Sequence, residues 1–260
     1  MKPTDLNRCL PRRNVSPSTG VKIGVVTDVH YGDYEVMGHM RKFVEDMNTR
    51  FFPDFVVELG DLVGHSAGEK ELAEINAEYA KCHAPRYYVI GNHDISRLSR
   101  WAFKKVVGID YNWTFTTVGF LHVIFLDCAW GQWNDRSSGP FGHIPREELE
   151  WLEGHLRTLP EDQPIIAFSH FPIRVFADRE WAQCMMDNED ELMGLFNGYN
   201  LLATFSGHIS PGGYKEVDGV HHFCLRKMWE FGSYTKITIT PDRLEIEGEN
   251  GQMSFSLPLA

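Results

Sequence analysis

Five short polar segments of the chain follow apolar runs and carry side chains that bind divalent metal ions. Carboxylate, imidazole and amide donors suit manganese, iron, zinc or cobalt, whereas a thiolate site would need cysteines that these segments lack. One carboxylate can bridge two such cations about 3.5–4 Å apart. The segments are Asp28-Val29-His30, Gly60-Asp61, Gly91-Asn92-His93-Asp94, Ser169-His170 and Gly207-His208. Together they predict a two-metal centre.

Each segment taken alone has a plainer explanation. An Asp-x-His or Gly-Asp pair at a strand end is more often a turn or a cap, and a single histidine is more often a core or surface residue. The segment 91–94 is less easily dismissed, because Asn, His and Asp after a buried strand cost solvation energy unless they are paired. The five segments occur in order, each after an apolar run, and this joint occurrence favours the metal site.

The apolar runs that precede these segments predict strands whose ends could meet. We expect strands at 21–27, 54–59, 86–90, 121–127, 165–169 and 201–206, with helices near 35–50, 69–81 and 145–159. This alternation predicts parallel strands covered by helices, and ligands of such sheets bind beyond the carboxyl ends of the strands. Short alternating runs in 214–257 predict an antiparallel finish. The predicted fold is α/β, with two facing sheets and helices outside.

Composition excludes several classes of partner. The 260 residues contain 25 Lys and Arg against 36 Asp and Glu, a net charge of −11. Extended nucleic acid and anionic membranes need a basic face, so neither is expected. No apolar run approaches the roughly 20 residues of a membrane span, and 1–20 lack the apolar part of a signal peptide. Five scattered cysteines without a CxxC pair indicate a reducing compartment. We therefore expect a cytoplasmic protein, with a loose arm at 1–20 and one domain at 21–260.

The ordered series D-x-H, G-D, G-N-H-D, H and G-H, from Asp28 to His208, resembles the calcineurin-like metallophosphoesterases. Past it, the segment SGHISPGGYKEVDGVHHFCL, with REELEWL before it and TKITITPDRLEIEG after it, is similar to the manganese-dependent ADP-ribose/CDP-alcohol diphosphatase branch. The resemblance implies a four-layered α/β sandwich and two divalent metal ions, with manganese, iron or zinc expected. It also implies hydrolysis of a small phosphodiester or nucleotide diphosphate.

The resemblance assigns a role to each matching residue. The first metal would be held by Asp28, His30 and Asp61, and the second by Asp61 as a bridge, Asn92, His170 and His208. The cations would lower the pKa of a bridging water to near 7, and the resulting hydroxide would attack phosphorus. His93 would be the general acid, since an ordinary imidazole titrates close to neutral pH. Asp94 would be the partner of the His93 imidazole.

Two positions depart from the family pattern. The family usually closes with G-H-x-H, whose final histidine binds the first metal, but this chain has Ser210 there, and the second Asp that usually follows G-D is absent. A neutral hydroxyl binds divalent metals far less well than imidazole, so we expect a weak first site and a stronger second one. His65, His221 or His222 could compensate. A catalytically impaired scaffold or binding protein is therefore an alternative interpretation, and a phosphomonoesterase is another.

Two features bear on the substrate. The stretch 129–144 is rich in aromatic and turn residues and lies between a strand and a helix, so it predicts either a loop whose rings stack on a base or a surface-packing segment. Arg174 and Arg179 follow His170 and either meet a second phosphate or are solvated surface residues. The sequence does not indicate an oligomeric state.

Overall fold

The computed structural model describes residues 20–130, 142–175, 185–250 and 253–259. Its first sheet joins the N-terminal strands to the last strands of the chain, in the order β12-β11-β10-β1-β2-β3. The pairs β1–β2 and β2–β3 are parallel, whereas β1–β10, β10–β11 and β11–β12 are antiparallel. The strands are β1 (Val21–Val26), β2 (Phe55–Glu58), β3 (Arg86–Tyr88), β10 (Thr235–Thr240), β11 (Arg243–Gly248) and β12 (Phe255–Pro258).

The second sheet has the order β4-β5-β6-β7-β9-β8. Its four central strands are parallel, and β4 and β8 pair antiparallel at its two edges. The strands are β4 (Thr114–Val118), β5 (Leu121–Phe125), β6 (Ile165–Phe168), β7 (Leu201–Ser206), β8 (Gly213–Val217) and β9 (Val220–Cys224). Both sheets are therefore mixed: the parallel strands form the middle of the second sheet and, as β1, β2 and β3, one end of the first sheet.

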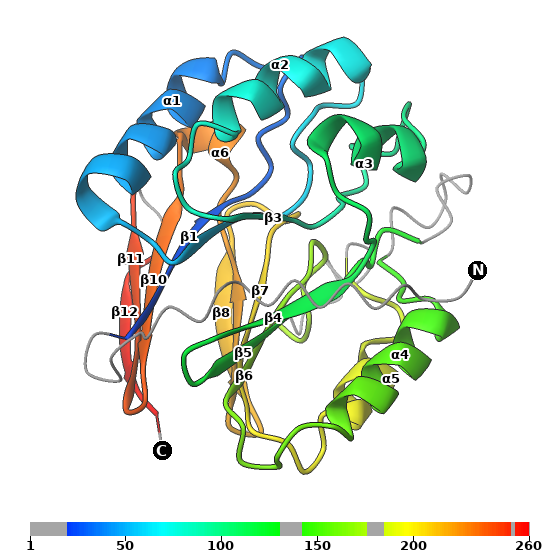
Figure 1. Cartoon of the computed structure of the whole chain (residues 1–260), viewed down its shortest axis with the longest axis vertical. Coiled ribbons are helices and arrows are strands. Elements are labelled where there is room, and N and C mark those ends of the chain that lie inside the picture. The colour runs from blue at the N-terminus through cyan, green and yellow to red at the C-terminus, as the bar shows by residue number, and fades with distance from the viewer. Residues whose placement is uncertain (1–19, 131–141, 176–184, 251–252, 260) are drawn as a thin grey trace.

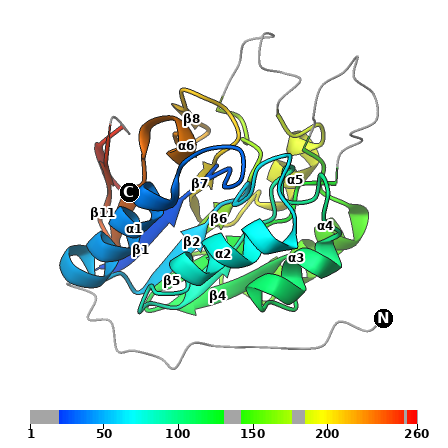
Figure 2. The same ribbon diagram turned by 90° about the horizontal axis from the view of Figure 1, so that it is seen from above.

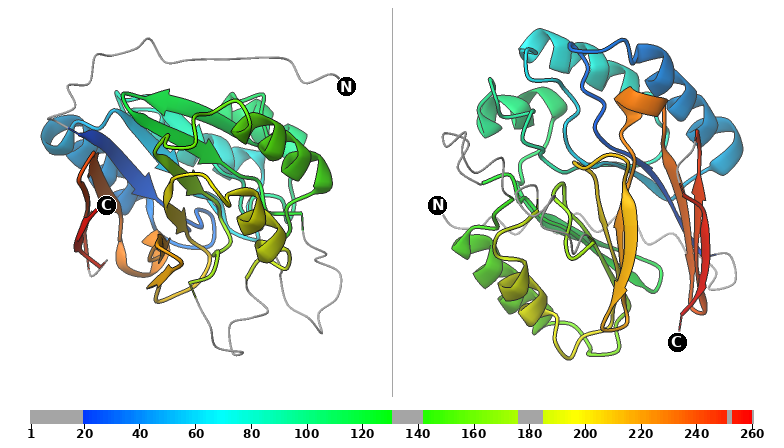
Figure 3. Two further views of the ribbon diagram at one scale, coloured as in Figure 1. Left: turned by 90° about the horizontal axis from the view of Figure 1, so that it is seen from below. Right: turned by 180° about the vertical axis from the view of Figure 1, so that it is seen from behind.

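Helices form the two outer layers. The first sheet is covered by α1, α2 and α3, and the second by α4 and α5 (Figures 1 and 3). A short helix, α6, connects β9 to β10. The bounds are α1 (Met37–Asp46), continued by a π-helical turn η1 (Met47–Phe51), α2 (Glu69–Tyr79), α3 (Arg100–Val107), α4 (Arg146–Leu156), α5 (Glu189–Leu195) and α6 (Met228–Phe231). No helix among the described residues is both long and apolar enough to cross a membrane.

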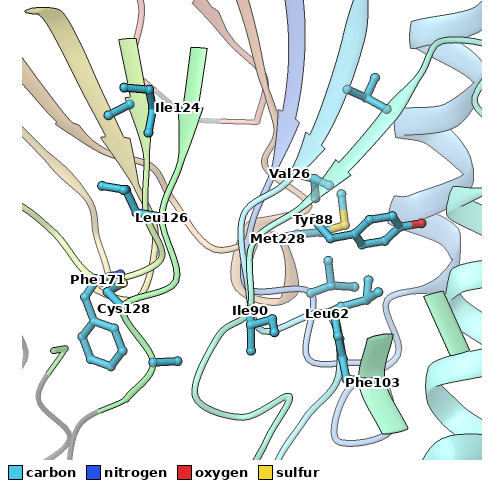
Figure 4. Packing of buried hydrophobic residues seen from close by; sticks show 14 of the residues in the cluster. Val26, Leu62, Tyr88, Ile90, Phe103, Ile124, Leu126, Cys128, Phe171 and Met228 are labelled. Carbon is cyan, nitrogen blue, oxygen red and sulfur yellow. Dashed lines mark hydrogen bonds between the residues drawn. The ribbon is translucent and has the colours of Figure 1, made fainter. Parts of the chain in front are cut away.

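Alternation along the strands divides the core into layers. Ile23 and Val25 of β1 pack with residues of the second sheet, between the two sheets. Val26 points to the other face and packs with Met40 and Phe43 of α1. Figure 4 shows this helix-side cluster, in which Val26, Tyr88 and Met228 lie together. The period-two pattern of β1 thus buries side chains on both faces of the first sheet at this strand.

The predicted fold class is confirmed, and two local predictions need correction. The expected strands and helices are present, most of them with trimmed ends, but α3 and β4 lie in a stretch where none was expected. The finish is not wholly antiparallel, because β9 pairs in parallel with β7. Asp218-Gly219 joins β8 to β9, and both residues have positive φ, as a type I′ hairpin turn requires. The expected arm lies, except for Gly20, outside the described residues.

Candidate metal centre

The candidate ligands follow the carboxyl ends of parallel strands in both sheets. Asp28 and His30 follow β1, Asp61 follows β2, and Asn92 follows β3, while His170 and His208 follow β6 and β7. Figure 2 shows β1, β2, β6 and β7 ending in the same region of the molecule. Backbone bonds tie two of these loops together, because the Asp28 and His30 N–H groups donate to the carbonyls of Gly60 and Asp61, each at 2.9 Å. The structure thus assembles residues that are distant in sequence.

Asp61 lies between two sets of donors. Its Oδ2 atom is 3.4 Å from His30 Nε2 and 3.2 Å from His170 Nε2. The His30 side also includes His93, and the His170 side also includes His208, with donor atoms of each set within 4.8 Å of one another. Asp61 therefore belongs to both sets, as a bridging carboxylate must.

The two remaining candidate ligands, Asp28 and Asn92, each lie next to one of these sets. Asp28 Oδ1 is 3.6 Å from His30 Nε2. Asn92 Oδ1 is 3.1 Å from His170 Nε2. All six candidates are thus connected by short contacts, with Asp28 and His30 on the first side, Asn92, His170 and His208 on the second, and Asp61 common to both.

Several polar atoms at this centre are buried and have no hydrogen-bond partner among the described residues. They are Asp28 Oδ1, His30 Nε2 and His93 Nδ1. A buried polar atom without a partner costs about 1–3 kcal/mol, and coordination to a cation removes that cost. The donor set of carboxylates, imidazoles and one amide also matches first-row divalent metals. The residues present therefore fit a pair of divalent metal ions.

The backbone at the candidate ligands is conformationally unusual. Four of them have positive φ, which non-glycine residues seldom adopt and which costs about 1–3 kcal/mol each. The four are Asp28 (50°), His30 (52°), Asp61 (61°) and His208 (70°). Such conformations persist where the surrounding structure enforces them, and they cluster at functional sites.

Two glycines allow the chain to approach the candidate ligands closely. A Cβ atom at Gly60 would lie 2.4 Å from His170 Nδ1, and one at Gly91 would lie 2.2 Å from Asp61 Oδ1. Both distances are far below van der Waals contact. Any side chain at these positions would displace His170 or Asp61, which explains the glycine before Asp61 and the glycine before Asn92.

The contact expected between Asp94 and the His93 imidazole is not among the hydrogen bonds of the described residues. The Asp94 carboxylate instead accepts backbone N–H groups from Asp61 (2.9 Å), Val63 (3.1 Å) and Gly91 (2.9 Å). Burial, aided by the charge of Asp61, raises the pKa of Asp94 to about 7. Its geometry makes Asp94 a residue that holds the loops after β2 and β3 together.

Electrostatics on either side of Asp61 favour a cation. Burial opposes protonation of His30, but the nearby carboxylates of Asp28 and Asp61 raise its pKa to about 10. Burial likewise opposes protonation of His170, and Asp61 raises its pKa to about 9. In the metal-free protein, a protonated imidazole therefore stands on each side of Asp61, and metal binding must displace these protons.

Two imidazoles of the centre are neutral. Burial, reinforced by the charge of His170, lowers the pKa of His208 to about 3. Burial also lowers the pKa of His93. A neutral imidazole is the form that ligates a metal, so His208 needs no proton release.

The position of the missing family histidine is tied to α6. The Ser210 hydroxyl is hydrogen-bonded to the Glu230 carboxylate. His221 contacts the Tyr214 hydroxyl, and His222 contacts the Thr204 hydroxyl, both within the second sheet. Among the described residues, these contacts direct neither histidine to the first side of Asp61.

His65 is the remaining candidate replacement. Its ring centroid is 6.0 Å from that of His93, with the rings edge to face. Within the described part of the chain, His65 is therefore a neighbour of His93, and its ring contacts do not extend to His30.

Three residues beside the first side were not anticipated from the sequence. Lys227 Nζ lies 3.7 Å from Asp28 Oδ1. The rings of Tyr34 and Trp229 stack with centroids 4.1 Å apart, and the Trp229 ring is 6.2 Å from that of His30. None of these residues belongs to a metal-binding pattern, so only their position in the fold relates them to the site.

The predicted substrate loop is largely outside the described residues, which omit 131–141 and also Arg179. Trp130, at its start, packs its ring against the Arg100 guanidinium at 3.6 Å. Arg174 is described, and its guanidinium forms ion pairs with Asp190 (2.6 Å) and Asp218 (3.7 Å). The charge of Arg174 is therefore already compensated by protein carboxylates.

Comparison with known proteins places this geometry in context. The model of the calcineurin-like phosphoesterase family matches residues 21–211. The chain is 25% identical to the manganese-dependent ADP-ribose/CDP-alcohol diphosphatase of Arabidopsis thaliana, over 89% of this chain and 94% of that protein. It is also 25% identical to a probable glycerophosphodiester phosphodiesterase of Arcobacter nitrofigilis, over 70% of this chain and 63% of that protein, and so spans less than two thirds of this relative.

Two solved structures share the fold. A dimetal phosphatase from Danio rerio superposes with a TM-score of 0.79 at 17% identity, over 93% of this chain and all of that one. GAP50, described as the anchor in the inner membrane complex of Plasmodium, superposes with a TM-score of 0.68 at 13% identity, over 93% and 90% of the two chains. One fold thus carries both a phosphatase and an anchor, so function must be argued from the site.

Proposed function

The chain belongs to the calcineurin-like phosphoesterase family, and from that premise we propose that it hydrolyses phosphodiester or nucleotide pyrophosphate bonds at a two-metal centre. One observation carries the proposal. The Asp61 carboxylate lies within 3.4 Å of imidazoles from two different sheets, which is the arrangement that a metal-bridging ligand requires. The unpartnered Asp28 and His30 atoms support it, because a cation would satisfy both.

The residues around Asp61 would hold the two ions, and the surrounding chain would fix their positions. When bound, the metals neutralise charge on the phosphoryl oxygens and lower the pKa of water. Asp28 and His30 would hold the first ion, and Asp94 would keep the Asp61 loop in register through its three backbone hydrogen bonds. Gly60 and Gly91 leave the space that His170 and Asp61 occupy.

His93 would transfer the proton to the leaving oxygen. Burial lowers its pKa, so its imidazole is neutral in the free protein at neutral pH. A bound phosphate brings negative charge that favours the protonated form. His93 would take its proton from solvent once the substrate is bound and pass it to the leaving oxygen, and general acid catalysis of this kind is worth about 10²–10⁴-fold in rate.

A nucleotide diphosphate is the substrate class that we favour, with manganese as the metal. The match to the Arabidopsis diphosphatase extends over nearly the whole of both chains, which supports this choice over other diesters. The three described cysteines are free and buried, in keeping with a reducing, cytoplasmic setting. No extended nucleic acid or membrane partner is proposed.

Hydrolysis assays with Mn²⁺ test the proposal directly. ADP-ribose and CDP-choline should be hydrolysed, with bis-p-nitrophenyl phosphate as a general diester and p-nitrophenyl phosphate reporting phosphomonoesterase activity. The matched control is Asp61→Asn, which should be inactive on all of them. Wild-type rates no higher than those of Asp61→Asn would reject the enzyme.

A binding or scaffold protein is the second candidate. The observation that favours it is Ser210, whose hydroxyl is bonded to Glu230 where the family places a metal-binding imidazole. Its signature would be Mn²⁺ binding without hydrolysis of any of these substrates.

A further inference from the structure

The first side of the centre holds a positive charge that belongs to the chain. Lys227 immediately precedes α6, and its Nζ lies 3.7 Å from Asp28 Oδ1. Its side chain is only 18% exposed. The backbone around it is fixed, because the Met228 and Trp229 N–H groups donate to the carbonyls of Thr27 and Asp28 at 3.0 and 3.1 Å. The segment that carries Lys227 is therefore anchored to the strand end that carries Asp28.

Lys227 faces the Asp28 carboxylate oxygen that is available to bind a metal ion. Asp28 Oδ2 accepts the Thr27 hydroxyl and the His208 backbone N–H, both at 2.8 Å. Asp28 Oδ1 accepts no hydrogen bond from the described residues. It lies within 4 Å of both Lys227 Nζ and His30 Nε2, so the ammonium and a first metal ion would draw on the same oxygen.

The same short segment also engages the position of the missing ligand. Glu230 binds the Ser210 hydroxyl, and Trp229 packs beside His30 and stacks on Tyr34. Lys227 and the α6 residues that follow it thus lie beside the first side of the centre. Among the ion pairs of the described residues, no lysine or arginine contacts a candidate ligand that belongs to the second side alone.

We propose that the Lys227 ammonium is a built-in cation that keeps the first metal site weak, so that only the second site is occupied at low metal concentration. The inference rests on the proposed two-metal function. An ammonium is a compact point charge on a flexible stem. It repels an incoming divalent ion but can swing aside, so it lowers the affinity of the site without abolishing it.

Titration with Mn²⁺ alone measures the affinities of the two metal sites without any substrate, because the electron paramagnetic resonance signal reports the concentration of the free ion. Wild type should bind one tight equivalent and a second at least tenfold weaker. Lys227→Met should tighten the weak equivalent at least tenfold, and Lys227→Arg, which keeps the charge, should not. Lys70→Met is the matched control, because Lys70 is 79% exposed on α2 and its loss changes the net charge equally. That control should bind as wild type does.

Lys227→Gln is a second neutral substitution, with a polar side chain, for the case that Lys227→Met does not fold. Thermal unfolding tests whether both variants are folded. The weak equivalent should disappear in Asp28→Asn, which identifies it with the first side. Unchanged Mn²⁺ curves in both neutral variants would overturn the proposal. So would a raised KM with unchanged Mn²⁺ curves, because Lys227 would then bind the substrate phosphate.

Failure of this inference is separable from failure of the proposed function. Hydrolysis with identical Mn²⁺ curves for wild type and the neutral variants rejects the role of Lys227 alone. The opposite result is that Mn²⁺ binds in two steps, that the weak step tightens in the neutral Lys227 variants, and that no substrate is hydrolysed. This result would support the role of Lys227 and reject the enzymatic function.

Discussion

Replacing Asp61 with asparagine should remove metal from both sides of the centre, whereas replacing His93 with alanine should leave metal in place. Asp61 Oδ2 is within 3.4 Å of His30 Nε2 and 3.2 Å of His170 Nε2, and Oδ1 accepts the His93 backbone N–H at 2.7 Å. The substituted amide would keep the shape of the side chain and lose its charge. His93, although its ring lies near His30 and Asp61, is assigned proton transfer and not ligation.

The structure gives the size of the effect. Burial lowers the pKa of His170, yet Asp61, the largest opposing influence, raises it from the usual 6.5 to about 9. At 1.36 kcal/mol per pKa unit, the net shift corresponds to about 3 kcal/mol of attraction for a cation at this position, to which Asp61 contributes most and Asp28 and the Leu59 carbonyl add the rest. Asp61→Asn should therefore weaken Mn²⁺ binding by a factor on the order of 100. His93→Ala should lower kcat about 10²–10⁴-fold.

Manganese content after equilibrium dialysis, at a Mn²⁺ concentration that fills both sites of wild type, is one readout, and steady-state kinetics of ADP-ribose hydrolysis is the other. Asp61→Asn should lose both equivalents of manganese and nearly all activity. His93→Ala should keep the manganese content of wild type while kcat falls. Equal loss of manganese from both variants would refute the reasoning, because His93 would then be a ligand of the first metal.

Three further predictions follow from neighbouring positions. Ser210→His should lower the Mn²⁺ concentration for half-maximal activity with little change at saturation, and identical half-saturation would mean that the first site does not need the imidazole. Gly91→Ala should cut activity at least ~100-fold, because its Cβ would meet Asp61 Oδ1 at 2.2 Å, whereas Gly154→Ala, in open space on α4, should stabilise the protein by about 0.5–1 kcal/mol at full activity. Burial raises the pKa of Glu58 well above 4.5, so the folded state holds this proton more tightly than the unfolded chain and the metal-free protein loses stability as pH rises above about 4.5. Urea unfolding with chelator at pH 5 and pH 7.5 should show this loss in wild type and a smaller one in Glu58→Gln.

The sequence was most informative where one local pattern determines position. A buried strand followed at once by Asp, His or Asn places its polar residue at the carboxyl edge, and the structure brings these residues together for β1, β2, β3, β6 and β7. Short, half-exposed elements leave a weaker pattern. β4 carries three threonines at the edge of a sheet, and α3 buries only Ala102 and Phe103, so neither was expected.

Contacts that depend on how elements pack could not be predicted from the sequence. The nearness of Asp94 to His93 in sequence suggested a side-chain pair, but the turn directs the carboxylate to the backbone of the Asp61 loop. Lys227 reaches Asp28 only because β9 pairs in parallel with β7 and delivers the following residues to the end of β1. No spacing rule relates positions 28 and 227 before that pairing is known.

The two sides of the centre differ in what assembles them. The second side joins Asp61 and Asn92 of the first sheet to His170 and His208 of the second, so it exists only when the sheets are packed together. The first side draws Asp28, His30 and Asp61 from the first sheet alone. Metal binding at the second side must therefore stabilise the packing of the two sheets, because an ion that binds only the folded state adds its binding free energy to stability. If Ser210 and Lys227 weaken only the first side, as proposed, the chain would retain the ion at the second side, which would hold the two sheets together.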